Sequence, residues 1–196
     1  ILLVNGELTL AELGAGELAR VTGTPGALSS DVILFDAAVF PLGAPATIDV
    51  RPPVPTPGPS PTPPAPGDVL PKVSRPGLPP LTGGRDVIDA TGRGVIVSAG
   101  VGGPEMFDGL VLRSNDNAVR GLELRHFDAA ITVAGSALGN VIGGAAPGEG
   151  NIVVDNVAGI VLRGAGVQRT VVYGNRVGID RADQAAGNAT YGIVLL

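Results

Sequence analysis

Short apolar segments separated by polar and glycine-containing turns recur along the second half of the chain. A four-residue unit consists of Gly or Ala, Ile or Leu, any residue, and Leu or Val. It occurs at 109–112, 130–133, 159–162 and 192–195. Segments of this length bounded by turn residues are typical of β-strands.

A second unit, Val followed by any residue and Gly, comes after the first three of these segments. Its valines are Val119, Val141 and Val172, which lie 9, 10 and 12 residues after Leu110, Ile131 and Ile160. Two strands in a fixed order, with a nearly constant spacing, indicate one repeating coil of a solenoid.

The coils become longer toward the C-terminus. Leu110 and Ile131 are 21 residues apart, Ile131 and Ile160 are 29 apart, and Ile160 and Ile193 are 33 apart. The additional residues follow the second strand in each longer coil, at 145–151 and around 180–190. Since insertions at one place per repeat lie on one face of a solenoid, we expect both loops to lie on the same face of a stack of parallel strands.

Asparagines follow glycines at the expected turns. An Asn side chain can hydrogen-bond turn backbone and tolerates the left-handed conformation. Stacked coils would place such amides one above another, where they would satisfy buried backbone groups. We therefore expect structural corners at Asn140, Asn151, Asn175 and Asn188.

The first part of the chain has a different organisation. Residues 1–50 contain apolar, strand-like segments and one weakly helical stretch at 8–18, so they are expected to form a strand-rich or capping segment. Residues 51–80 form a proline-rich insertion or arm, expected to be extended polyproline II over 51–68, and residues 81–196 form the coils. The arm is either an exposed loop insertion or linker, or else a recognition arm or a site for O-linked sugar on Thr56, Ser60 and Thr62.

Composition narrows the classes of function. The net charge of −5 and the pI near 4.8 argue against nucleic acid as a partner. The absence of cysteine excludes disulfides and thiolate metal sites. No apolar run is long enough for a membrane-spanning helix. With 31 Gly, 18 Pro and only 3% aromatic residues, the core is expected to consist of aliphatic side chains between frequent turns.

Several segments together resemble the right-handed parallel β-helix proteins of bacterial cell surfaces, which share the pectate-lyase-like superfold. They are DVILFDAAVFPLGAPATI (31–48), LPPLTGGRDVIDATGRGVIV (78–97), DGLVLRSNDNAVRGLELRHF (108–127), GNVIGGAAPGEGN (139–151) and YGNRVGID (173–180). The resemblance implies an all-β, right-handed parallel β-helix and an extracellular or cell-surface location. Because this fold also includes polysaccharide lyases and hydrolases, the resemblance leaves the activity open.

One stretch has the residue types that catalysis would need. It contains Arg120, Glu123, Arg125, His126 and Asp128. A lyase would need calcium-binding carboxylates and a basic Arg, and a hydrolase would need converging carboxylates. No acidic residue recurs at the matching positions of later coils, so we expect instead a solvated strand face with Glu123 and Arg125 pointing outward together. A calcium site at Asp180 and Asp183 is a weaker hypothesis, and no other cofactor is expected.

The segments at the two ends of the chain are apolar. Ile1, Leu2, Leu3 and Val4 form one such run, and Tyr191, Ile193, Leu195 and Leu196 belong to the other. Unpaired strands over an open core favour pairing with copies of the chain or with adjoining β-helix coils.

We therefore expect a non-catalytic, secreted structural protein that assembles end to end into filaments or forms a module of a larger adhesin. The alternatives are a polysaccharide-active lyase or hydrolase, and a carbohydrate-binding module that contacts surface polysaccharide, although the scarcity of aromatic residues disfavours the last.

Overall fold

The computed structural model describes the backbone of residues 2–4 and the whole of residues 32–50, 78–100 and 107–196. Within these ranges the ordered elements are β-strands, and no helix is present. The predicted helical stretch at 8–18 and almost all of the proline-rich arm at 51–80 lie outside the described residues.

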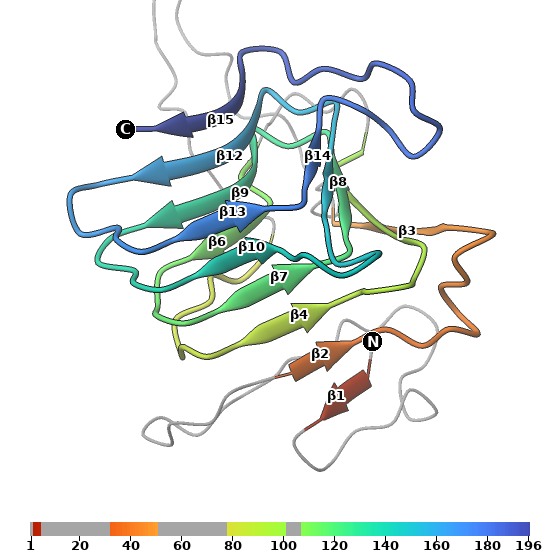
Figure 1. Cartoon of the computed structure of the whole chain (residues 1–196), viewed down its shortest axis with the longest axis horizontal. Coiled ribbons are helices and arrows are strands. Elements are labelled where there is room, and N and C mark those ends of the chain that lie inside the picture. Colours follow the sequence, from red (N-terminus) through yellow and green to blue (C-terminus); the bar gives the residue numbers. More distant parts are fainter. Residues whose placement is uncertain (1, 5–31, 51–77, 101–106) are drawn as a thin grey trace, which may run out of the picture.

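The strands form three sheets (Figure 1). Sheet A contains, in spatial order, β1 (Leu2–Val4), β2 (Val32–Leu34), β4 (Val87–Asp89), β7 (Ala118–Arg120), β10 (Val141–Gly143) and β13 (Val171–Tyr173). Sheet B contains β3 (Ala46–Asp49), β5 (Val95–Ser98), β8 (Glu123–Arg125), β11 (Ile152–Val153) and β14 (Arg176–Val177). Sheet C contains β6 (Leu110–Leu112), β9 (Ala129–Ala134), β12 (Ala158–Arg163) and β15 (Tyr191–Leu195).

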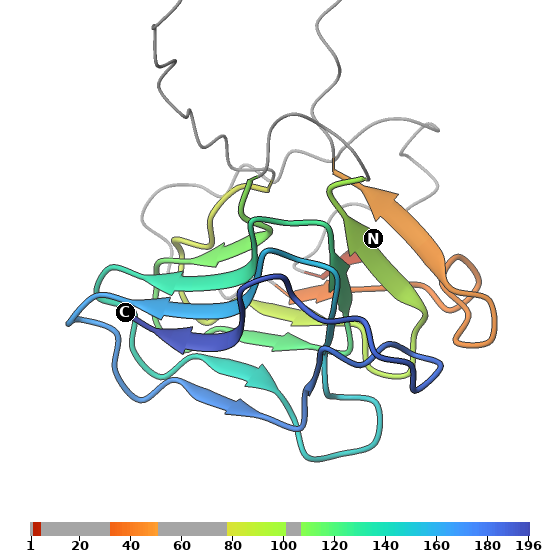
Figure 2. The same cartoon turned by 90° about the horizontal axis from the view of Figure 1, so that it is seen from above.

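The chain passes through sheets A, B and C in turn and then repeats this path one strand further along each sheet. We call one such passage a circuit. Circuit 1 contains β2, β3 and Leu81, which bridges to Leu112 of β6, and circuits 2 to 5 begin at β4, β7, β10 and β13. All strand pairs between circuits are parallel, and among the described strands only β1 pairs in the antiparallel direction, with β2. This stacked, all-β arrangement is compatible with a parallel β-helix (Figures 1 and 2).

The strand register confirms the repeat of the first unit. Leu110, Ile131, Ile160 and Ile193 are paired in sequence across sheet C. The predicted equivalence of Val119, Val141 and Val172 in the second unit is wrong at one position. Ile142, and not Val141, pairs with Val119 and with Val172. Two adjacent aliphatic residues satisfied the pattern equally well, and a shift of one residue reverses the face on which a side chain lies.

The expectation that both insertions share one face is wrong. Residues 145–151 lie between β10 and β11, at the corner from sheet A to sheet B, whereas residues 180–190 lie between β14 and β15, at the corner from sheet B to sheet C. The second strand of each circuit, which belongs to sheet B, separates these corners. In circuits 4 and 5 this strand is only two residues long, too short to produce a recognisable sequence period.

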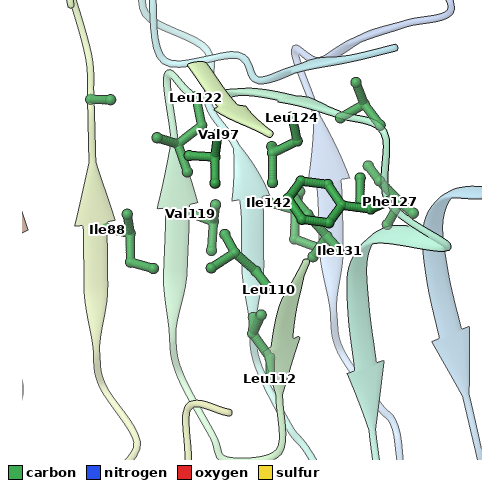
Figure 3. Packing of buried hydrophobic residues seen from close by; sticks show 14 of the residues in the cluster. Ile88, Val97, Leu110, Leu112, Val119, Leu122, Leu124, Phe127, Ile131 and Ile142 are labelled. Carbon is green, nitrogen blue, oxygen red and sulfur yellow. The ribbon is translucent and has the colours of Figure 1, made fainter. Parts of the chain in front are cut away.

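The core occupies the space between the three sheets (Figure 3). In each sheet, inward-facing aliphatic side chains of successive circuits lie one above another and form a column. Sheet A supplies Ile88, Val119 and Ile142, and sheet B supplies Val97 and Leu124. Phe127, which is fully buried, fills the corner before sheet C and meets the ring of Phe107 edge-on at 6.0 Å between centroids.

The glycine at the start of two sheet C units, Gly109 and Gly159, has a steric cause. A Cβ at Gly109 would lie 2.5 Å from the carbonyl oxygen of Ala130, and one at Gly159 would lie 2.2 Å from that of Gly192. Both distances are shorter than any ordinary contact. The close approach of successive circuits at these two positions therefore explains why Gly stands there.

Candidate functional site

The asparagines form three stacked pairs, one at each corner of the circuit. Asn117 and Asn140 precede strands of sheet A, Asn151 and Asn175 precede strands of sheet B, and Asn156 and Asn188 precede strands of sheet C. In each pair the side-chain NH₂ of the first Asn donates to the Oδ1 of the second, at 2.8, 3.0 and 2.9 Å respectively.

These amides also satisfy backbone groups along the stack. Oδ1 of Asn151 accepts the N–H of Leu122 at 3.1 Å, and its Nδ2 donates to the carbonyl of Val119 at 2.9 Å. The first Asn of the other pairs accepts a backbone N–H from the preceding circuit in the same way. The arrangement has the role of a structural corner, since the polar atoms of these side chains are directed at the backbone.

Two members of these pairs, Asn117 and Asn156, were missed in the sequence. The predicted pattern was Asn after Gly, whereas these two follow Asp116 and Asp155. Both aspartates have a positive φ, 57° and 55°, so Asp takes the left-handed position that Gly takes elsewhere. A search for Gly, Asp or Asn before Asn would have found both.

Glu123 is the most deeply buried acidic group of the 120–128 stretch. It lies on β8 between Leu122 and Leu124, which point into the core. Glu123 is 1% exposed. Its carboxylate pairs with the guanidinium of Arg125 and, at 3.0 Å, with Nε of Arg181. Glu123 and Arg125 therefore do share a face, but that face is not solvated at Glu123, because the 178–190 loop brings Arg181 over it.

The remaining residues of the stretch have separate partners. Arg120 pairs with Glu149 at 3.1 Å, and His126 Nδ1 lies 2.9 Å from the hydroxyl of Ser98. The backbone N–H of Asp128 donates to Phe107. In the described part of the chain, the partners of the Glu123 carboxylate are two arginines and not a second carboxylate, whereas general acid and base catalysis would need a pair of acids.

The calcium hypothesis concerned Asp180 and Asp183. Oδ1 of Asp180 accepts the N–H groups of Ala182 and Gln184, each at 2.8 Å. Asp183 pairs with Arg176 at 2.5 Å. Across residues 32–50, 78–100 and 107–196, no three His, Asp or Glu side chains are grouped so that they could hold a metal ion. These aspartates are engaged in organising the 180–190 loop.

Circuit 5 presents the strongest candidate for an interaction site. Its strands lie at one edge of all three sheets. Tyr191, Ile193, Leu195 and Leu196 are exposed by 56, 48, 76 and 74%, and Val171 and Tyr173 of β13 are exposed as well. Of the other predicted assembly residues, Leu2, Leu3 and Val4 form β1, and Ile1 lies outside the described residues.

Comparison with protein-family models, curated proteins and solved structures finds no match for this chain. In the described part of the chain, no helix has the length and apolar character needed to cross a membrane.

Proposed function

We propose that the chain is a right-handed parallel β-helix that acts as a non-catalytic structural module of the cell surface and associates end to end with copies of itself through circuit 5. The observation that supports this proposal is the apolar edge formed by β13, β14 and β15, which pairs with no further strand among the described residues. The extracellular location follows from the resemblance to cell-surface β-helix proteins.

The chemistry of β15 favours strand addition. An edge strand carries a row of unpaired N–H and C=O groups, and proteins usually protect such strands with charges, proline or bulges. The sequence of β15, YGIVL, contains no charged residue and no proline. A strand from another molecule would pair with these backbone groups and cover the apolar side chains at the same time.

The open end of the core adds a second driving force. Ile193 continues the column that contains the fully buried Ile131 and Ile160, yet it is 48% exposed. Burial of apolar surface contributes about 25 cal/mol per Å². Copies stacked on circuit 5 would therefore gain both hydrogen bonds and hydrophobic burial.

Sedimentation velocity over a wide range of concentration tests the proposal. The comparison uses the unaltered chain, Leu195→Lys on β15 and the control Leu42→Lys. Leu42 is also an exposed leucine, at 57%, but lies in the loop between β2 and β3. We expect the unaltered chain and Leu42→Lys to form larger species as concentration rises, and Leu195→Lys to remain monomeric.

Negative-stain electron microscopy of the larger species would then distinguish filaments from closed dimers. Circular dichroism of each variant shows whether it is folded. Monomers of the unaltered chain at every concentration, or equal association of both lysine variants, would overturn the proposal.

A further inference from the structure

A groove lies on the outside of the corner between sheets A and B. Its volume is about 580 Å³, within the range of small-molecule sites, and it is open on one side. Its lining contains glycine-rich segments from four circuits, together with Arg93, Arg176 and Arg181. It shares Arg176 of β14 with the edge of circuit 5 but contains no residue of β15.

The loop at 144–150 forms one wall by reaching back over a neighbouring circuit. In circuit 3 the corner is reduced to Gly121, where a Cβ would lie 2.5 Å from the backbone of Ala90. This tight corner lets the loop of circuit 4 approach the corner of circuit 2. A Cβ at Gly148 would lie 3.2 Å from the backbone nitrogen of Gly92, so these two glycines are neighbours although they are far apart in sequence.

The charge of the lining is opposite to that of the protein. The chain has a net charge of −5, but the described residues that line the groove include three arginines and no Asp or Glu. Two of the arginines are already paired, Arg176 with Asp183 and Arg181 with Glu123. Arg93 donates only to the backbone carbonyls of Phe35 and Gly92 and, within the described part of the chain, pairs with no carboxylate.

Backbone donors lie next to Arg93. The N–H groups of Gly92 and Gly148 have no acceptor among the described residues. Both glycines have a positive φ, 68° and 84°, and turns of this kind can form concave clusters of N–H groups that bind anions. A guanidinium adjacent to such donors provides both charge and directed hydrogen bonds.

We propose that this end of the groove binds an oxyanion, the phosphate or carboxylate group of a small ligand, through the guanidinium of Arg93 and the amide N–H groups of Gly92 and Gly148. The remaining volume of the groove accommodates the body of that ligand. The glycines are required because side chains at these positions would fill the space where the oxygen atoms bind.

The test is a ¹⁵N–¹H correlation titration of the full chain with inorganic phosphate and, separately, with acetate, at constant ionic strength maintained with chloride. We expect saturable shifts of the Gly92 and Gly148 amide signals. Saturation by phosphate alone assigns a phosphate ligand, and saturation by acetate alone assigns a carboxylate ligand. Absence of saturation with both anions would overturn the proposal.

Two variants and one control identify the site. Arg93→Gln should weaken binding by about tenfold or more, because a charge-assisted contact is lost. Arg113→Gln removes the same charge from an exposed position at the end of β6 and should leave binding unchanged. Equal weakening by both would show a general charge effect and refute the site.

Because Arg93 also anchors Phe35, Gly148→Ala provides an independent variant. It keeps all charges and introduces a Cβ near Gly92 N, so it should abolish the saturable shifts. Signal dispersion shows whether each variant is folded, and normal binding by folded Gly148→Ala would contradict the proposed geometry.

Discussion

The same tetrapeptide, Gly-Ile-Val-Leu, occurs at 159–162 in circuit 4 and at 192–195 in circuit 5. Both copies form strands of sheet C, and Ile160 and Ile193 are paired directly. Ile160 is fully buried, whereas Ile193 is 48% exposed. Identical local sequences therefore have different environments, and the difference arises because β15 covers Ile160, whereas no strand among the described residues covers Ile193.

This comparison separates two effects. Local sequence decides that a segment forms a strand and which side chains face inward. Neighbouring circuits decide how much of that inward surface is buried and hydrogen-bonded. If this separation is correct, the same substitution should have a large effect in an inner circuit and a small effect in circuit 5.

The largest difference is expected for the paired isoleucines. Ile160→Ala should lower the free energy of unfolding by about 2–5 kcal/mol, because it removes buried methyl groups and leaves a cavity. Ile193→Ala should cost less than about 1.5 kcal/mol in the monomer, because half of its surface is already in water. Urea denaturation at low protein concentration measures both, and equal losses would contradict the separation.

Glu123 and Asp183, which each form an ion pair with arginine, provide a second comparison. Glu123→Ala should cost about 3 kcal/mol, since it leaves two guanidiniums without the buried acid between them. Asp183→Ala also removes an ion pair with arginine, but the Asp183 side chain is 82% exposed, and the cost should be about 1 kcal/mol or less. Thermal and urea unfolding of the two variants should rank them in this order. The opposite ranking would show that Glu123 is not a structural anchor.

The smallest difference is expected at the asparagine corners. Asn151→Ala leaves the buried N–H of Leu122 and the carbonyl of Val119 without partners and should cost about 2–3 kcal/mol. Asn175 is its partner in circuit 5 and is partly exposed, so Asn175→Ala should cost about 1 kcal/mol, because water can replace its bonds. Urea denaturation of the two variants compares them, and a larger loss for Asn175→Ala would show that the stack is anchored from circuit 5.

The sequence predicted the strands of sheets A and C well, because their apolar residues recur with a clear spacing. It predicted sheet B poorly, since β11 and β14 consist of two residues each. The local sequence pattern also could not predict that Glu123 is buried, because Arg181, which covers it, is 58 residues away in the chain. The groove was missed for the same reason, as Gly92 and Gly148 meet only after three circuits have stacked.

Hydrogen–deuterium exchange at low and high protein concentration tests the central claim, that circuit 5 is an open edge that pairs with another copy. The amides of β12 should be protected at both concentrations. Those of β15 should exchange rapidly at low concentration and become protected as concentration rises, and Leu195→Lys should abolish that gain. Exchange of β15 that is rapid and independent of concentration would contradict the account.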